Sequence, residues 1–262
     1  MTVGCNQRFT PQKWDRIKYL IRVHSAMVRG ITKRESWAIS GYNYFDLYAG
    51  PGFYGDEIGG SLFGSEGSPL IAAAVLRWQK HKLFFNDADP SCIARLTTTL
   101  AASSIQAQVS CMDVRDFTGL VCTDIWRAAQ FGCLDCKAMG LVFADPNGSP
   151  DWDALESLTR CRQYDRLDVL VNVNATSIKR CRRSPLHQHK YHALADDLAR
   201  LRKRYLYVWT PHRSNAWQFA LIFATNWKDF PQFEHSKFWR VDSPDGREVF
   251  DRLNRTEKER AA

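Results

Sequence analysis

The 262-residue chain lacks any apolar run long enough to span a membrane, and its first residues lack the apolar core of a signal peptide. The first absence argues against a membrane-spanning protein, and the second argues against a secreted one. We therefore expect a soluble protein that is located in the cytoplasm and has no membrane among its partners.

Cysteines are too scattered to form an obvious metal site. The chain has eight, and only Cys133 and Cys136 form a Cys-x-x-Cys pair. A structural zinc site needs a second pair or two histidines at ligand spacing, and His187, His189 and His192 lie far away in the sequence. We expect reduced thiols and no metal, although the spacing alone leaves open whether the pair binds one.

Internal repeats and low-complexity segments are also missing, which argues against repeat architectures and biased linkers. With 45% hydrophobic and 24% charged residues, the composition is that of a globular protein. The pattern predicts a basic N-terminal helix and connector over residues 1–41, an α/β domain over residues 42–225, and a C-terminal extension over residues 226–262 that packs on the same domain.

Acidic residues are scarce in two segments, although the net charge of the whole chain is only +8. Residues 1–34 contain eight Lys or Arg and one Asp, and residues 178–204 contain nine Lys or Arg and two Asp. Two concentrated basic segments on an otherwise acidic body favour a polyanionic partner such as nucleic acid. The alternative is that both are solvated helix faces.

Short apolar runs alternate with helical patterns from residue 42 onward. We expect strands over residues 44–48, 83–85, 107–111, 140–144 and 167–173, and a later antiparallel pair over residues 205–209 and 217–224. Helices are expected over residues 11–29, from residue 68 onward, after residue 90 to about 102, and over residues 117–129, 152–161, 187–204 and 246–259. The first helix is amphipathic and basic, so we expect its charges to face outward. The alternation predicts a parallel sheet with helices on both faces.

An aspartate stands at or just after the end of each of the first four strands, where parallel strands bind ligands. Gly50 and Gly52 follow the first strand and let a ligand approach the main chain. A nucleoside ligand suits these residues: Asp87 accepts the ribose hydroxyls, Asp113 accepts an adenine amino group, and Asp145 lies where a reacting group is held.

Two cofactors suit such a site: a nicotinamide dinucleotide and S-adenosylmethionine. Residues 50–55 match the dinucleotide pattern G-x-G-x-x-G, but the next helix starts only about a dozen residues later. The pyrophosphate would therefore have no helix N-terminus, which counts against a nicotinamide oxidoreductase. Asp46, four residues before Gly50, favours S-adenosylmethionine because a carboxylate there can meet the cofactor's ammonium group.

Residues 45–52, Phe-Asp-Leu-Tyr-Ala-Gly-Pro-Gly, resemble the first motif of S-adenosylmethionine-dependent nucleic-acid methyltransferases. Together with Gly67-Ser68-Pro69-Leu70, they more closely resemble the three-Cys-motif partner family, whose members have the methyltransferase fold and are encoded beside iron–sulfur-type partner proteins. Residues 143–148, Phe-Ala-Asp-Pro-Asn-Gly, are similar to that family's Asp-Pro-aromatic-Gly signature. The resemblance covers roughly residues 11–225.

The resemblance implies a Rossmann-like class I methyltransferase fold, with a seven-stranded, mostly parallel sheet, an antiparallel last strand and helices on both faces. It implies S-adenosylmethionine as the cofactor, DNA or RNA as the substrate, and a protein partner of the three-Cys-motif type. The cofactor-binding residues would be Asp46, Tyr48, Gly50, Gly52, Asp87 and Asp113.

The acceptor site would be formed by Asp145, Pro146 and Asn147. Methyltransferases that act on base amines have Asp-Pro-Pro-aromatic here, so this chain lacks the ring that stacks a flipped base. Phe53 or Tyr54 in the glycine-rich loop is the alternative stacking ring. No Pro-Cys dipeptide occurs, which favours a nitrogen or another heteroatom of nucleic acid over carbon.

A basic cluster follows the fifth strand and suits phosphate contacts; it consists of Lys179, Arg180, Arg182 and Arg183. The altered acceptor motif also supports a second hypothesis, a non-catalytic or partner-dependent nucleic-acid-binding module. The target base and atom, the choice between DNA and RNA, the oligomeric state and the need for a partner stay open.

Overall fold

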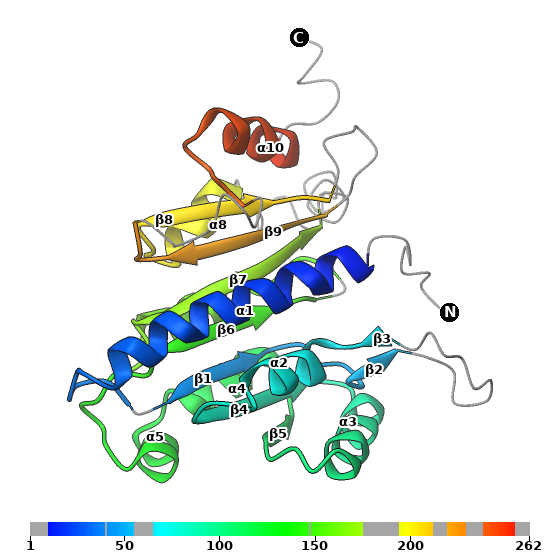
Figure 1. Ribbon diagram of the computed structural model, residues 1–262, viewed down its shortest axis with the longest axis vertical. Helices are drawn as coiled ribbons and strands as arrows, with labels where there is room; N and C mark the ends of the chain where they lie inside the picture. Colours follow the sequence, from blue (N-terminus) through cyan, green and yellow to red (C-terminus); the bar gives the residue numbers. More distant parts are fainter. Residues whose placement is uncertain are drawn as a thin grey trace.

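The computed structural model describes residues 10–39, 41–54, 65–146, 148–174, 194–211, 219–228 and 238–254. Its centre is an eight-stranded sheet with the order β10-β8-β9-β7-β6-β1-β4-β5 (Figure 1). In chain order the strands of this sheet are β1 (Tyr42–Asp46), β4 (His81–Asp87), β5 (Gln108–Cys111), β6 (Gly140–Ala144), β7 (Leu167–Asn174), β8 (Tyr205–Trp209), β9 (Phe219–Thr225) and β10 (Trp239–Arg240).

The first five strands of this sheet, in chain order, are parallel to one another. The order in which they are added to the sheet reverses at β1. β4 and β5 lie on one side of β1, and β6 and β7 lie on the other. A crevice forms at such a switch point, outside the carboxyl ends of the strands. Asp46 ends β1 and Asp145 follows β6, so these two carboxylates flank the switch point.

The sheet confirms the predicted fold class, with one strand more than expected. β9 is antiparallel to both of its neighbours, β7 and β8, as predicted for the last long strand. The count of seven strands was wrong, because β10 adds an eighth strand at the edge, antiparallel to β8. Two residues make this strand, which is too short for periodicity in the sequence to reveal it.

Helices cover both faces of the sheet (Figure 1). One face packs against α1 (Thr10–Thr32), α2 (Ser68–Leu76) and α3 (Pro90–Ala102). The other face packs against α4 (Val114–Val121), α5 (Asp124–Phe131), α6 (Trp152–Arg160), α8 (Leu194–Arg200) and α10 (Pro244–Asn254). All five residues of β1 are buried, as expected for a central strand covered on both faces. α1 contributes to the same core as β1; the predicted domain boundaries at residues 41 and 225 stay a prediction.

Several predicted helices have other bounds in the structure. The helix expected over residues 117–129 is two helices, since the Thr123 hydroxyl accepts a hydrogen bond from Trp126 N (3.3 Å) and caps a new start. The last helix begins at Pro244 and is described as far as Asn254. Within the glycine-rich loop, β2 (Phe53–Tyr54) pairs with β3 (Ser65–Glu66). None of the described helices is long and apolar enough to span a membrane.

Candidate active site

The turn after β1 has the backbone geometry that its glycines predict. Gly50 has φ +61° and Gly52 has φ +77°, both in the left-handed region that favours glycine. A Cβ on Gly52 would lie 2.6 Å from Leu96 Cδ1, so the position is also crowded by α3. Gly52 O accepts a hydrogen bond from Gly67 N (2.8 Å), which ties the turn to the start of α2.

Asp87, the last residue of β4, holds this turn in place. Its Oδ2 accepts a hydrogen bond from Gly50 N at 2.8 Å, and its Oδ1 accepts one from Asp89 N at 2.9 Å. Each carboxylate oxygen has two lone pairs, so both oxygens can still accept from a ligand hydroxyl. The predicted ribose-binding residue and the predicted main-chain contact are therefore neighbours.

Asp46 is fully buried beneath the turn. Its pKa is raised to about 7, chiefly by burial and to a lesser extent by the nearby carboxylates Asp145 and Asp87, against hydrogen bonds from the Ser68 hydroxyl and Tyr48 N that lower it. The donor from Tyr48 lies 3.3 Å from Asp46 Oδ1. A carboxylate in this setting gains from a positively charged neighbour, such as a ligand ammonium group.

Asp145 lies at the centre of a hydrogen-bonded cluster that draws on three elements. Its Oδ2 forms an ion pair with Lys13 of α1, and its Oδ1 accepts a hydrogen bond from Asn172 Nδ2 of β7 at 2.6 Å. Both members of the ion pair are largely buried, with side-chain exposures of 13% and 16%. The cluster places a cation and an amide beside the predicted acceptor residue.

Two aromatic rings border this cluster. Lys13 Nζ lies 4.8 Å from the centre of the Trp14 ring and 6.0 Å from that of Phe219. The expectation that the charges of α1 face outward is therefore wrong for Lys13. Its long side chain points inward, where the ammonium group forms an ion pair with Asp145 and lies close to two aromatic rings.

Tyr48 and Asp113 have structural partners at this edge. The Tyr48 hydroxyl accepts a hydrogen bond from Asp151 N (3.2 Å) at the start of α6, and burial raises its pKa to about 12. Asp113 is exposed and caps α4, with its Oδ1 accepting from Arg115 N at 2.8 Å. Asp113 lies near Tyr48, since its charge also raises the Tyr48 pKa. Both residues stay candidates for cofactor contacts.

The remaining predicted residues divide into described and undescribed positions. Phe53 lies in β2 and is 39% exposed, and Tyr54 follows it in the same strand. Pro146 is half-buried directly after Asp145. Asn147 and the basic cluster lie outside the described residues; the cluster consists of Lys179, Arg180, Arg182 and Arg183.

The carboxyl edge fits S-adenosylmethionine on observations of this chain. The turn has left-handed glycines beside a carboxylate, and Asp46 has a pKa that a ligand cation would lower. Within the described residues, Asn86 Oδ1 and Asn172 Oδ1 at this edge are buried and have no hydrogen-bond donor. Such atoms are rare in folded proteins and mark sites for an ordered water or a ligand.

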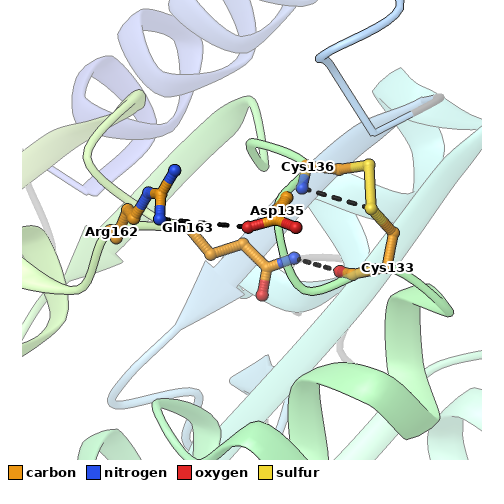
Figure 2. The surroundings of a disulfide bond; sticks show 5 residues. All are labelled: Cys133, Asp135, Cys136, Arg162 and Gln163. Atoms are coloured by element: carbon orange, nitrogen blue, oxygen red, sulfur yellow. Dashed lines mark hydrogen bonds and ion pairs between the residues drawn. A yellow bond between two sulfur atoms is a disulfide. The ribbon is translucent and has the colours of Figure 1, made fainter.

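The expectation of reduced thiols is wrong for one pair of cysteines, whereas Cys92, Cys111, Cys122 and Cys161 are free thiols as expected. Cys133 and Cys136 form a disulfide in the segment between α5 and β6 (Figure 2). Gln163 Nε2 donates to Cys133 O at 2.8 Å, and Arg162 pairs with Asp135 at 3.9 Å. In the described part of the chain, no group of three or more His, Cys, Asp or Glu side chains is placed to hold a metal ion.

Sequence reasoning missed Lys13 and Asn172 as site residues. Lys13 is 132 positions away from Asp145, and its spacing along α1 is the same as that of exposed cations. A signal did exist for Asn172, because this polar residue directly follows the apolar run over residues 169–171 near the end of β7.

A scan of protein-family models and a search of the curated proteins found no match to this chain. Solved structures resemble it at low identity. A Legionella pneumophila protein shares 12% identity, with 89% of this chain and 90% of that one covered and a TM-score of 0.47.

A Methanococcus jannaschii fibrillarin, described as a pre-rRNA processing protein, shares 11% identity over 78% of this chain and 74% of that one, with a TM-score of 0.46. A structure described as a putative rRNA methylase from Clostridium thermocellum shares 11% identity, with 86% of this chain and 99% of that one covered and a TM-score of 0.44. The fold assignment rests on the sheet order described above, and similarity at this level assigns no substrate.

Proposed function

We propose that this protein is an S-adenosylmethionine-dependent methyltransferase that acts on a nitrogen or another heteroatom of nucleic acid. The observation that supports this most strongly is the meeting of three carboxylates at one switch point. Asp46, Asp87 and Asp145 come from three neighbouring strands, and Asp87 holds Gly50 at 2.8 Å. This arrangement suits a ligand with an ammonium group, a ribose and a reactive centre.

The cofactor, when bound, supplies a methyl group on a positively charged sulfur. Asp46 binds the ammonium group, Asp87 accepts the ribose hydroxyls, and Asp113 accepts the adenine amino group. Gly50 and Gly52 leave the main chain open to the ligand. Tyr48 fixes the turn against the start of α6 through its bond to Asp151 N.

Asp145 orients the acceptor. Lys13 and Asn172 each engage one of its oxygens, so the carboxylate has a fixed orientation and keeps lone pairs for an acceptor N–H or O–H. Holding that proton would orient the acceptor towards the bound cofactor. After transfer of the methyl group, Asp145 or water would take up the acceptor's surplus proton. Positioning of this kind supplies much of the rate enhancement in such reactions.

Nucleic acid is the proposed substrate because of the charge distribution. β7 ends at Asn174, at the same edge as Asp145, and the basic cluster from Lys179 to Arg183 begins five residues later in the sequence. Cations in this part of the chain suit the phosphates of a strand whose base enters the site. Phe53 and Tyr54 are the candidates for stacking that base, and a three-Cys-motif protein is the proposed partner.

Transfer of labelled methyl groups tests the proposal. The purified protein is incubated with methyl-labelled S-adenosylmethionine and with separate pools of DNA, RNA and protein. We expect label in a nucleic-acid pool, lost in Asp145→Ala while cofactor binding persists, and kept in Asp116→Ala, an exposed carboxylate on α4. Label in the protein pool alone would overturn the proposed substrate.

One observation favours the second candidate, a nucleic-acid-binding module without catalysis. Lys13 already forms an ion pair with Asp145, which places a cation where an acceptor has to approach. If this pair is permanent, the protein binds nucleic acid without transferring methyl groups. Nucleic-acid binding with no label transferred to any pool, in the presence of bound cofactor, would select this candidate.

A further inference from the structure

Two adjoining cavities lie at the amino edge of the sheet, opposite the candidate active site. Their volumes are about 260 Å³ and 270 Å³, and both are lined by Arg166 and Asn226. These residues flank the first residue of β7 and the last of β9, whereas Asp145 lies at the far end of β6. Each volume is below the roughly 300–1,000 Å³ of a drug-sized ligand site, and the two together fall within it.

The first cavity is cationic. Its charged lining consists of Arg160, Asp165, Arg166, Arg202 and Lys203. The one carboxylate is shared, because Lys137 Nζ lies 2.7 Å from Asp165 Oδ2 and Arg166 Nε lies 3.9 Å from Asp165 Oδ1, which leaves more cations than carboxylates in the lining. Arg202 is exposed, and within the described residues its guanidinium has no hydrogen bond or ion pair. The surplus positive charge suits an anion.

Lys203 strengthens this conclusion, because its ammonium group is only partly satisfied. It donates to Asp165 O at 2.8 Å and, among the described residues, to nothing else. Burial lowers the pKa of Lys203, although the carboxylates Asp168 and Asp165 act against this. An ammonium group that is removed from water and has spare donors gains from a phosphate oxygen.

The second cavity has the character of a base-binding pocket. It is lined by Trp37 and Trp227, two flat indoles, together with Met139 and Ile31. Trp37 is 40% exposed, and the Arg166 guanidinium lies 5.9 Å from the centre of its ring. Indole faces stack on bases of any sequence, and an arginine beside them adds a cation–π contact.

Polar groups in the second cavity match the edge of a base. Asp168 lines it with one carboxylate oxygen, Oδ1, that His24 does not engage, while the Asn226 amide nitrogen has no acceptor within the described part of the chain. Asn226 Oδ1 is already used by Arg204 N at 3.2 Å. Asp168 therefore presents an acceptor and Asn226 presents a donor. A base edge with an N–H beside a carbonyl oxygen or a ring nitrogen can bind to both.

A buried hydrogen-bond chain fixes Asp168. His24 Nε2 donates to Asp168 Oδ2 at 2.9 Å, and His24 Nδ1 shares a hydrogen bond with the Tyr42 hydroxyl at 2.6 Å. All three residues are at most 2% exposed, so Asp168 is held rigidly at the cavity.

We propose that this amino edge binds a nucleotide, with its phosphate in the cationic cavity and its base between Trp37 and Trp227. Arg166 and Asn226, which line both cavities, contact the two halves. The site stands apart from the proposed methyltransferase site and does not depend on it. A free nucleotide and one residue of a single strand share this chemistry.

Calorimetric titration with the four nucleoside monophosphates, adenosine, inorganic phosphate and ten-residue single strands of DNA and RNA tests the proposal. We expect saturable binding of at least one monophosphate, tighter than that of phosphate or nucleoside alone. Tighter binding of a strand, per nucleotide, identifies nucleic acid as the source, and equal binding identifies the free nucleotide.

Variants and matched controls make the test specific. Arg202→Glu and Trp37→Ala should each weaken nucleotide binding at least tenfold. Arg77→Glu and Trp78→Ala, an exposed cation and an indole 80% exposed elsewhere on the surface, should leave it unchanged. Asp87→Ala should also leave it unchanged, which separates this site from the cofactor site. Absence of nucleotide and strand binding, or equal losses in the control variants, would overturn the proposal.

Discussion

At the scale of single residues, the candidate site depends on how Asp145 is held. Its two oxygens face a lysine from α1 and an amide from β7, so the orientation of the carboxylate is set by groups from outside its own strand. If Asp145 orients an acceptor, then Lys13 is a positioning residue that acts through it. This distinguishes Lys13 from the exposed cations of the same helix.

Replacing Lys13 with alanine tests that role. The carboxylate loses its ion-pair partner and its fixed orientation, so we expect kcat for methyl transfer to fall about tenfold or more with cofactor affinity unchanged. Arg22→Ala on the exposed face of α1 is the control and should behave as wild type. If Lys13→Ala instead raised the rate, the ion pair would be an obstacle to the acceptor.

The raised pKa of Asp46 predicts a pH-dependent stability. Its folded-state pKa of about 7 lies above the ordinary 3.8, so the unfolded chain releases this proton first and the free energy of unfolding falls as pH rises towards 7. In Asp46→Asn this loss is absent. Denaturant unfolding at pH 5 and pH 8 should show a drop in wild type that is about 2–3 kcal/mol larger than in the variant, at 1.36 kcal/mol per pKa unit. Equal drops would contradict the burial argument.

The sequence predicted where the site aspartates lie in the sheet better than it predicted which side chains contact them. The positions of Asp46, Asp87 and Asp145 could be predicted because an aspartate at the end of a parallel strand lies at the carboxyl edge of the sheet. Lys13 was not predicted, since its contact spans 132 residues and depends on the angle at which α1 crosses the sheet. The disulfide was also missed, because a Cys-x-x-Cys pair has the same spacing whether reduced or oxidised.

At the scale of elements, the turn between β1 and β2 decides whether a ligand can reach the main chain. The left-handed glycines and the helix start at Ser68 are confirmed, but the first strand ends at Asp46, two residues before its predicted end at residue 48. Helix bounds were less predictable: a threonine cap splits one predicted helix at Thr123, and such a cap has a weak signal inside an amphipathic pattern.

Two glycine substitutions with opposite expected signs test this element. Gly52→Ala should lower the free energy of unfolding by about 1–3 kcal/mol, because an alanine at φ +77° is strained and its Cβ meets Leu96. Gly119→Ala in α4 has open space around the new Cβ and should raise stability by about 0.5–1 kcal/mol. Thermal or denaturant unfolding measures both. A neutral Gly52→Ala would show that the turn tolerates other backbone angles.

At the scale of the whole molecule, the sheet has two chemically different edges. The carboxyl edge gathers carboxylates around a glycine turn, and the amino edge gathers cations and indoles around two cavities. α1 runs along β6 and β7 and contributes to both, with Lys13 near one end and His24 further along (Figure 1). The uneven charge of the sequence predicted a polyanion, but not that cations would gather at the edge away from Asp145.

The salt dependence of nucleic-acid binding tests the proposed role of the basic cluster. Replacing Lys179, Arg180, Arg182 and Arg183 with alanine should reduce the slope of log K against log salt concentration by about 0.7 for each lost single-strand phosphate contact. Arg77→Ala with Lys80→Ala is the control and should leave the slope unchanged. An unchanged slope in the four-residue variant would place phosphate binding elsewhere on the protein.

Binding of S-adenosylmethionine at the carboxyl edge is the step on which the proposed function depends. Calorimetric titration of the purified protein with S-adenosylmethionine, its demethylated product and NAD, in wild type and in Asp87→Ala, tests it most directly. Saturable binding of the first two ligands, lost in the variant, is the predicted result, because Asp87 holds Gly50 and is the proposed acceptor for the ribose hydroxyls. Binding of NAD in place of S-adenosylmethionine, or of none of the three, would contradict the account.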